Sequence, residues 1–147
     1  MVIREVVESD FDQLLLLYTE LHSNPMPKQN GRLNTLWSVI LNDDGYHIVV
    51  AEENDQIVSS CTLVIVPNLT HQQRPYALVE NVITAREHQG KGFASACLDY
   101  ARGIAKRANC YKIMLLTGSK QESTHQFYRR AGYNSQDKTA FIQWLEP

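Results

Sequence analysis

The chain has 147 residues, of which 44% are hydrophobic and 20% charged, and its formal net charge is -2. This length and composition are typical of one globular domain with a proper core, and they exclude a disordered or fibrous chain. The slightly acidic balance argues against a broad basic surface that binds nucleic acid or an anionic membrane by counterion release. We therefore expect a single domain over residues 1–147, with any anion binding confined to a local site.

Cysteine spacing and the start of the chain indicate the compartment. The three cysteines, Cys61, Cys97 and Cys110, lie far apart and show neither a CxxC pair nor the Cys/His spacing of a metal site. The chain does not open on a basic stretch followed by an apolar core, and no apolar run approaches the roughly 18 residues of a membrane span. The sequence thus predicts a reduced, cytoplasmic protein without a metal site, a disulfide framework or a membrane segment.

Helices and strands are predicted from the spacing of apolar residues, beginning with a strand at Val2 to Val7. Ser9-Asp10 then precedes an apolar run from Phe11 to Leu21, which predicts a capped helix. The stretch from Ser23 to Arg32 is rich in Asn, Pro, Gln and Gly, as loops are. A second helix is expected from Leu33 to Leu41, where large apolar residues recur at helical spacing.

The middle of the chain is rich in Val and Ile. Tyr46 to Ala51 and Ile57 to Pro67 flank a polar turn, and this pattern predicts a β-hairpin. Asn68 to Pro75 is polar and is predicted to be a loop. Tyr76 to Thr84 is again typical of a strand.

The last third of the chain alternates helical and strand patterns. Gly92 to Asn109 has apolar residues on one helical face, and Cys110 to Leu116 is a nearly continuous apolar strand. Glu122 to Arg130 predicts a short helix, and Thr139 to Leu145 predicts a last strand. The resulting order, β-α-α-β-β-β-α-β-α-β, implies an α/β or α+β fold with a mixed sheet and helices on both faces.

The segment between the Tyr76 strand and the Gly92 helix is the most informative for function. Glycines at 90 and 92 lie where the strand turns into the helix, and they let the backbone approach a ligand closely. The first N–H groups of a helix have no partner within it and carry partial positive charge, so such a loop suits a pyrophosphate. A tight turn without a ligand is the alternative. The segment lacks the P-loop spacing, and Ser95 stands where a Rossmann fingerprint requires its third glycine.

These residues resemble a known family. Gln89 to Ala94 is similar to the Q/R-x-x-G-x-G/A signature of the GNAT N-acetyltransferases, and Phe127 to Tyr133 is similar to their F-Y-x-x-x-G-F. Where many members have Asn-x-x-Ala, this chain has Gln121 and Thr124, so those positions are not carried over. The resemblance implies a mixed, mostly antiparallel sheet flanked by helices on both faces. It also implies acetyl-coenzyme A as cosubstrate, attacked directly by an amine in a ternary complex.

The resemblance also implies which residues contact the coenzyme. Backbone amides of the loop are expected to hold its pyrophosphate, and the end of the preceding strand its pantetheine arm. The strand residues are Val82, Ile83 and Thr84, and the loop residues are Gln89, Gly90, Lys91, Gly92, Phe93 and Ala94.

Two residues are candidates for proton transfer. A lysine-like amine has a pKa near 10.4 and must lose a proton before it attacks a thioester. Glu80, on an otherwise largely apolar strand, is the candidate base, with a solvated or arginine-paired carboxylate as the alternative. By resemblance, Tyr128 is the general acid that protonates the leaving thiolate. The alternative is that it packs beside Phe127 with its hydroxyl in water.

The acceptor is expected to be a primary amine on a small molecule. Glu80-Asn81 and Cys110 to Ile113 resemble segments of glucosamine-6-phosphate N-acetyltransferases, which does not by itself fix the acceptor. Trp37 and the Leu14 to Leu17 run either pack in the core or line the acceptor cleft. Protein or peptide N-acetylation, a non-catalytic acyl-coenzyme A sensor, and a homodimer all stay open.

Overall fold

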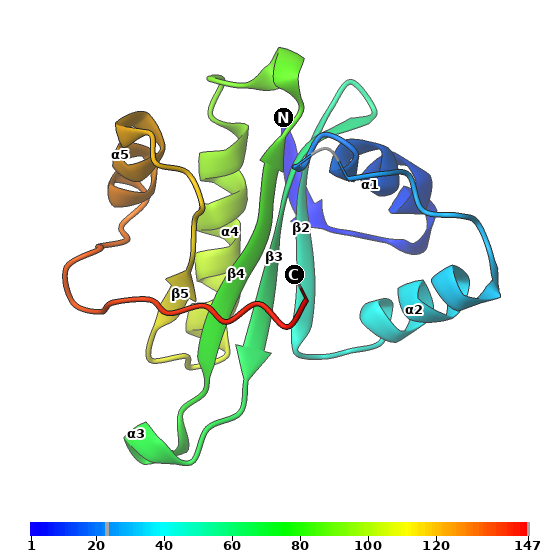
Figure 1. Cartoon of the computed structure of the whole chain (residues 1–147). Coiled ribbons are helices and arrows are strands. Elements are labelled where there is room, and N and C mark those ends of the chain that lie inside the picture. Colours follow the sequence, from blue (N-terminus) through cyan, green and yellow to red (C-terminus); the bar gives the residue numbers. More distant parts are fainter. Residues whose placement is uncertain (23, 147) are drawn as a thin grey trace. The chain divides into compact units, whose positions relative to one another are not determined.

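The computed structural model describes every residue except Ser23 and Pro147, and it consists of two compact units, residues 1–115 and 116–147 (Figure 1). The first unit contains one sheet, ordered β1-β2-β3-β4-β5. Its strands are β1 (Val2–Glu5), β2 (Tyr46–Glu53), β3 (Gln56–Val66), β4 (Tyr76–Thr84) and β5 (Ile113–Leu115). Its helices are α1 (Phe11–Tyr18), α2 (Gly31–Leu41), α3 (Thr70–Gln73) and α4 (Phe93–Arg107), with 3-10 turns η1 (Glu8–Asp10) and η2 (Arg86–His88). The second unit contains α5 (Glu122–Arg130).

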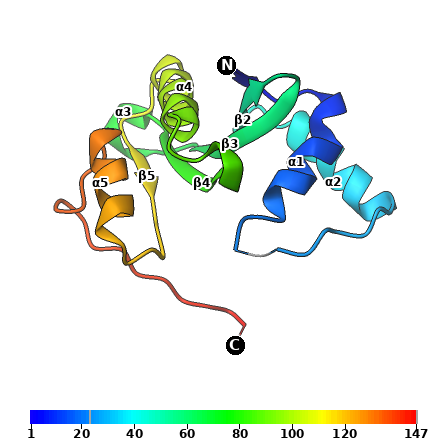
Figure 2. The same ribbon diagram turned by 90° about the horizontal axis from the view of Figure 1, so that it is seen from above.

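The sheet is mixed and mostly antiparallel, as predicted. β1 to β4 pair antiparallel in chain order, and only β4 and β5 run parallel. Successive strand residues face opposite sides, so full burial of both Val49 and Val50 requires cover on both faces. Figure 2 shows α1 and α2 on one side of β2 to β4 and α4 on the other. Ile48 and Val50 belong to the cluster that packs against Trp37, which places Trp37 in the core.

An ion-pair network fixes the start of α1 against the sheet. The Arg4 guanidinium lies 2.6 Å from the carboxylates of both Asp10 and Glu52. Asp10 also accepts a 2.7 Å hydrogen bond from the backbone N–H of Val7. The hydrogen bond from Arg4 is the main reason that the pKa of Asp10 lies below its usual range. β1, β2 and the entry to α1 are therefore held together at one point.

A β-bulge interrupts the pairing of β3 with β4. Thr62 lies opposite Glu80 and Ser60 opposite Ile83, so a single residue of β3 faces two residues of β4, Asn81 and Val82. Asn81 has a φ of +51°, in the left-handed region that asparagine adopts more readily than other non-glycine residues. The bulge interrupts the alternation of side chains along β4. As a result, the side chains of Glu80 and Ile83, which are three residues apart, lie on the same face of the sheet.

Two predicted elements differ from the structure. The predicted loop from Asn68 to Pro75 contains the four-residue α3, although His71 and Gln72 within it have left-handed backbone, and the last predicted strand is wrong. Residues 139–145 form no strand in the described part of the chain, although their aromatic and β-branched composition favours one. Phe141 and Leu145 are 91% and 92% exposed. Strand propensity largely measures packing on a neighbouring strand, and this segment has no ladder partner among the described residues.

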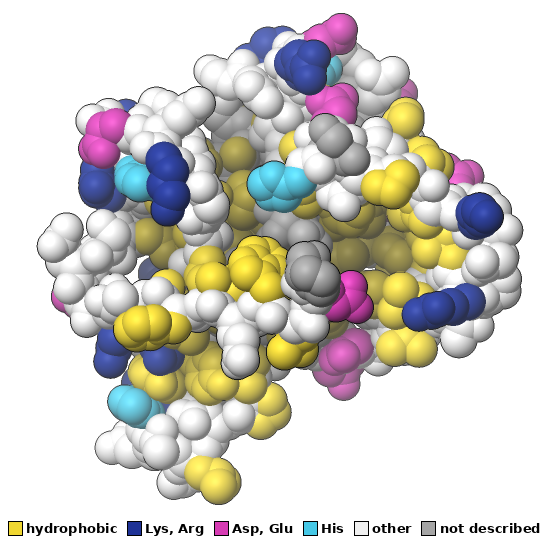
Figure 3. All heavy atoms as spheres, in the orientation of Figure 1, with side chains coloured by type: hydrophobic (Ala, Val, Ile, Leu, Met, Phe, Trp, Pro, Cys, Tyr) yellow, Lys and Arg dark blue, Asp and Glu magenta, His cyan; other side chains and the backbone are white. Residues whose placement is uncertain are grey.

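Two further observations concern membrane-spanning helices and basic side chains on the surface. No helix of the described residues is long and apolar enough to cross a membrane. On the face drawn in Figure 3, the Lys and Arg side chains that are shown are dispersed rather than gathered into one basic surface.

The left-handed backbone of Asn81 generates a stability prediction. Asn81→Val should lower the free energy of unfolding by about 1–3 kcal/mol, because a β-branched residue is strained at positive φ. Asn81→Gly should stay within about 1 kcal/mol of the parent, since glycine adopts this conformation freely. Glu80→Val, at the adjacent exposed strand position, is the matched control and should change stability by about 0.5 kcal/mol or less. Urea denaturation measures all three, and equal stabilities of the Asn81→Val and Asn81→Gly proteins would contradict the bulge.

Candidate active site

The connection from β4 to α4 presents its backbone outward. Gly90 and Gly92 have φ values of +75° and +88°, and a Cβ atom built on either would meet nothing within 4 Å. Gly92 is the N-cap of α4 and supplies no side-chain hydrogen bond to the helix. The first intrahelical bond runs from Ala96 N–H to the Gly92 carbonyl at 3.0 Å, so the preceding amides of α4 have no acceptor within the helix. Such amides at the positive end of a 15-residue helix suit an anion.

The base of this connection is held by other elements of the first unit. The Ala85 N–H donates to the Val58 carbonyl at 2.8 Å, and the Arg86 N–H donates to Glu20 Oε2 at 2.8 Å. The His88 ring lies 3.3 Å from the Glu53 carboxylate and meets the Phe93 ring edge-on at 5.9 Å. This connection is therefore tied to the turn that follows α1 and to the β2-β3 hairpin, while Gln89 to Gly92 stay exposed.

The end of β4 has one open edge. β5 pairs with β4 only at Ala77 to Val79, so β4 runs on to Thr84 without a strand on that side among the described residues. On the other side, Ser59 Oγ donates to the Ile83 carbonyl at 2.8 Å and lies 2.8 Å from Thr84 Oγ1. The open edge offers backbone groups to an extended ligand, as an unpaired strand edge does.

Glu80 lies at the bulge on the α1 side of the sheet. Its side chain is exposed and shares a face with Thr62, which lies opposite it on β3. Thr62 in turn lies opposite Ile48, a member of the cluster that packs against α1. Glu80, the predicted strand residues 82–84 and the predicted loop residues 89–94 thus all lie in the first unit.

Tyr128 lies on α5 in the second unit. Its side chain is half-buried, and its ring meets those of Phe127 and Tyr133 edge-on at 5.0 and 6.2 Å. The Tyr133 N–H donates to the Tyr128 carbonyl at 3.0 Å, which closes the end of α5. The ring of Tyr128 therefore packs within an aromatic group of the second unit.

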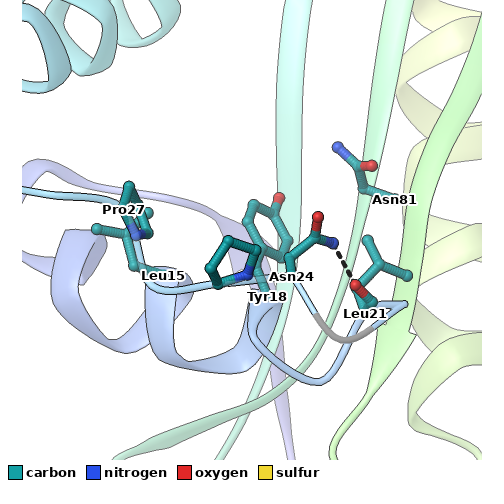
Figure 4. Close-up of a pocket in the computed structure, with 7 residues that line it drawn as sticks. Leu15, Tyr18, Leu21, Asn24, Pro27 and Asn81 are labelled. Atoms are coloured by element: carbon teal, nitrogen blue, oxygen red, sulfur yellow. Dashed lines mark hydrogen bonds between the residues drawn. The ribbon is translucent and has the colours of Figure 1, made fainter. Parts of the chain in front are cut away.

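A pocket of about 260 Å³, here called the α1 pocket, opens beside the bulge (Figure 4). It is formed by α1, the loop that follows α1, and β4. The lining residues are Leu15, Tyr18, Leu21, Asn24, Pro25, Pro27 and Asn81. In Figure 4, Asn24 donates to the Leu21 carbonyl and Asn81 lies across the pocket on β4. The pocket therefore adjoins Glu80, the residue that precedes Asn81.

Comparison with protein families identifies the family to which a chain with this fold and this β4-α4 connection belongs. The model of the acetyltransferase (GNAT) family matches residues 11–133. This range includes α1, β4, the connection from β4 into the start of α4 (residues 85–94, here called the α4 loop) and α5. The chain belongs to this family. The reaction class of this family is acetyl transfer, and the predicted GNAT fold is confirmed.

Individual relatives agree with the family. A solved structure from Agrobacterium tumefaciens str. C58, assigned as an acetyltransferase, is 38% identical, with a TM-score of 0.90 over 98% of this chain and 99% of its own. Glucosamine-6-phosphate N-acetyltransferase from Arabidopsis thaliana is 17% identical, with a TM-score of 0.86 over 99% and 98% of the two chains, and shares the fold. Glucosamine 6-phosphate N-acetyltransferase of Trypanosoma brucei brucei is 26% identical over 83 residues, 56% of this chain. The match spans only 54% of that relative's length.

Several residues of this GNAT site were not predicted from the sequence. Glu20, Ser59 and most residues of the α1 pocket act through contacts between segments far apart in the chain, which periodicity cannot show. Leu15 is an exception, because it belongs to the Leu14 to Leu17 run, for which the sequence predicts either core packing or a cleft lining; Leu14 and Leu17 pack in the core and Leu15 lines the pocket. Asn81 did carry a signal, because asparagine is depleted within strands and enriched at positive φ. No group of three or more metal-ligating side chains occurs among the described residues.

Proposed function

We propose that this GNAT chain transfers an acetyl group from acetyl-coenzyme A to a primary amine on a small molecule. The observation that carries the proposal is the uncapped start of α4, with two left-handed glycines, directly after the open end of β4. The GNAT family generally uses acetyl-coenzyme A, and two of the three relatives named above are called glucosamine-6-phosphate N-acetyltransferases.

In this proposal the coenzyme lies along β4 and ends at the α4 loop. The pyrophosphate accepts hydrogen bonds from the backbone N–H groups of Gln89 to Ala94, where the helix dipole favours negative charge. The pantetheine arm hydrogen-bonds the open edge of Val82, Ile83 and Thr84. This course carries the thioester toward the bulge, where β4 is distorted and Glu80 is exposed.

Glu80 acts as the base in the proposed reaction. A protonated amine cannot attack, and removing its proton at pH 7 costs about 4.6 kcal/mol for a pKa near 10.4. Glu80 takes this proton directly or through water, the amine nitrogen bonds to the thioester carbon, and the carbon–sulfur bond of the tetrahedral intermediate then breaks. No covalent enzyme intermediate forms.

Tyr128 acts as the general acid. Coenzyme A leaves as a thiolate whose intrinsic pKa is near 8.5, so protonation by the phenol assists departure at pH 7. The proton passes from the Tyr128 hydroxyl to the sulfur and is regained from solvent. A silent coenzyme sensor is disfavoured by the presence of both candidate proton-transfer groups, Glu80 and Tyr128, and protein or peptide acetylation is distinguished by the choice of acceptor in the assay below.

The role of Glu80 predicts a pH-dependent defect. Glu80→Gln should lower the rate of coenzyme A thiol release by roughly 10²-fold or more at pH 7, and by less above pH 9, where more of the amine is already neutral. The assay uses acetyl-coenzyme A with amino sugars, polyamines, aminoglycosides, amino acids and short peptides as acceptors. Glu8→Gln, a matched change at an exposed glutamate of η1, should leave the profile unchanged. A parental pH profile in Glu80→Gln would remove Glu80 from the reaction.

The role of Tyr128 predicts a defect confined to turnover. Tyr128→Phe keeps the ring and its packing, so folding and acetyl-coenzyme A affinity should stay normal while kcat falls by about 10²-fold. Tyr133→Phe removes a hydroxyl from the same aromatic group and should retain parental kcat. If Tyr128→Phe turns over within about twofold of the parent while chemistry is rate-limiting, solvent protonates the sulfur.

A further inference from the structure

We propose that the α1 pocket binds an acceptor amine that carries no phosphate or carboxylate group. This inference rests on the proposed acetyl transfer and specifies its substrate class. It separates this chain from the relatives that are named for glucosamine 6-phosphate.

The position of the pocket links it to the reaction. Asn81 supplies its β4 wall and immediately follows Glu80, and the bulge at Asn81 sets the direction of both side chains. Tyr18 supplies the α1 wall, and its hydroxyl lies beside those of Thr62 and Ser60, which face Glu80 and Ile83 across the strand pair. An amine bound in the pocket therefore lies on the same face of the sheet as Glu80.

The lining carries no formal charge. Four of the seven lining residues are leucine or proline, and the remaining three offer a phenol and two carboxamides. Burial raises the pKa of Tyr18, so its phenol stays neutral at physiological pH. A phosphate or carboxylate in this pocket gains no lysine or arginine partner from the lining, whereas sites for such groups supply one.

Charges of both signs adjoin the lining in the chain, and the helix end adds partial negative charge. Tyr18 is the last residue of α1, where the helix dipole is negative, and Leu21 follows it by three residues. Glu20 and Glu80 adjoin lining residues, and so does Lys28, which follows Pro27. The end of α1 favours an ammonium over an acidic substituent.

The polar groups of the lining favour hydroxyls on the acceptor. The Asn24 amide nitrogen donates to the Leu21 carbonyl, so its oxygen is left to accept from a ligand (Figure 4). The hydroxyls of Tyr18, Ser60 and Thr62 are fully buried, and Ser60 and Thr62 do not belong to the lining, so the lining offers a ligand the two asparagine amides and apolar surface. A compact amine with hydroxyl groups and an apolar ring or chain matches this mixture of amides, leucine and proline.

Matched acceptor pairs test the proposal. Coenzyme A release is measured with glucosamine against glucosamine 6-phosphate, galactosamine against galactosamine 6-phosphate, and ethanolamine against phosphoethanolamine. The unphosphorylated member should have the higher kcat/KM, by about tenfold or more in each pair that reacts. Equal or inverted preferences would overturn the proposal. If no pair member reacts although calorimetry shows that acetyl-coenzyme A binds, the acceptor class is wrong while the coenzyme site stands. If acetyl-coenzyme A does not bind, the proposed function itself fails.

A charge introduced into the pocket provides a second test. Asn24→Lys, and separately Pro27→Lys, should raise kcat/KM for the phosphorylated member of a pair by about fivefold or more relative to the unphosphorylated one. Asn34→Lys places the same charge on the exposed face of α2 and should leave the ratio unchanged. If all three lysine variants shift the ratio equally, the pocket does not select the acceptor and the proposal is wrong.

Discussion

The bulge in β4 is the constraint on which the candidate site depends. Two residues of β4 face one residue of β3, and Asn81 takes up the difference with a left-handed backbone. A regular strand would place Glu80 and Ile83 on opposite faces. With the bulge, Glu80 lies over the α1 side of the sheet while Ile83 still packs into the core beside α1. One backbone irregularity thus provides both a packed sheet and an exposed carboxylate beside a pocket.

The α4 loop illustrates how a binding surface is held in place without being covered. Its ends are bonded to Val58 and Glu20, and the His88 ring packs against Phe93. Between these contacts the backbone carries two glycines and no capping side chain. The helix start is therefore rigidly placed, yet its amides remain available. The hydrogen bond to Glu20 also connects the loop with the turn that follows α1, next to residues that line the α1 pocket.

Much of the fold could be predicted, because most elements obey one clear period. The bounds of β4 and α5 agree with the apolar spacing residue for residue, and α4 begins one residue after its predicted start. The strand predicted at Thr139 to Leu145 is wrong because composition alone does not supply a partner strand. The predicted strand from Cys110 to Leu116 shortens to three residues for the same reason, since only Ile113 to Leu115 pair with β4.

The site was predictable only where it depends on local sequence. Gln89 to Ala94 form one continuous motif, and their geometry follows from glycine at two positions of positive φ. The α1 pocket joins α1 and the proline-rich loop that follows it to Asn81 of β4, which lies more than fifty residues farther along the chain. The hydrogen bond from Arg86 to Glu20 likewise spans 66 residues. The spacing of apolar residues cannot predict contacts between residues so far apart in the chain.

The central claim is that the α4 loop binds the coenzyme pyrophosphate, and calorimetric titration with acetyl-coenzyme A tests it most directly. Gly92→Asn tolerates the left-handed backbone but fills the open space at the helix start, so the protein should fold and bind at least about tenfold more weakly, a loss of about 1.4 kcal/mol. Gly103→Ala, a glycine replacement inside α4, is the control and should bind like the parent. Parental affinity in a folded Gly92→Asn protein, or no binding by the parent itself, would contradict the account.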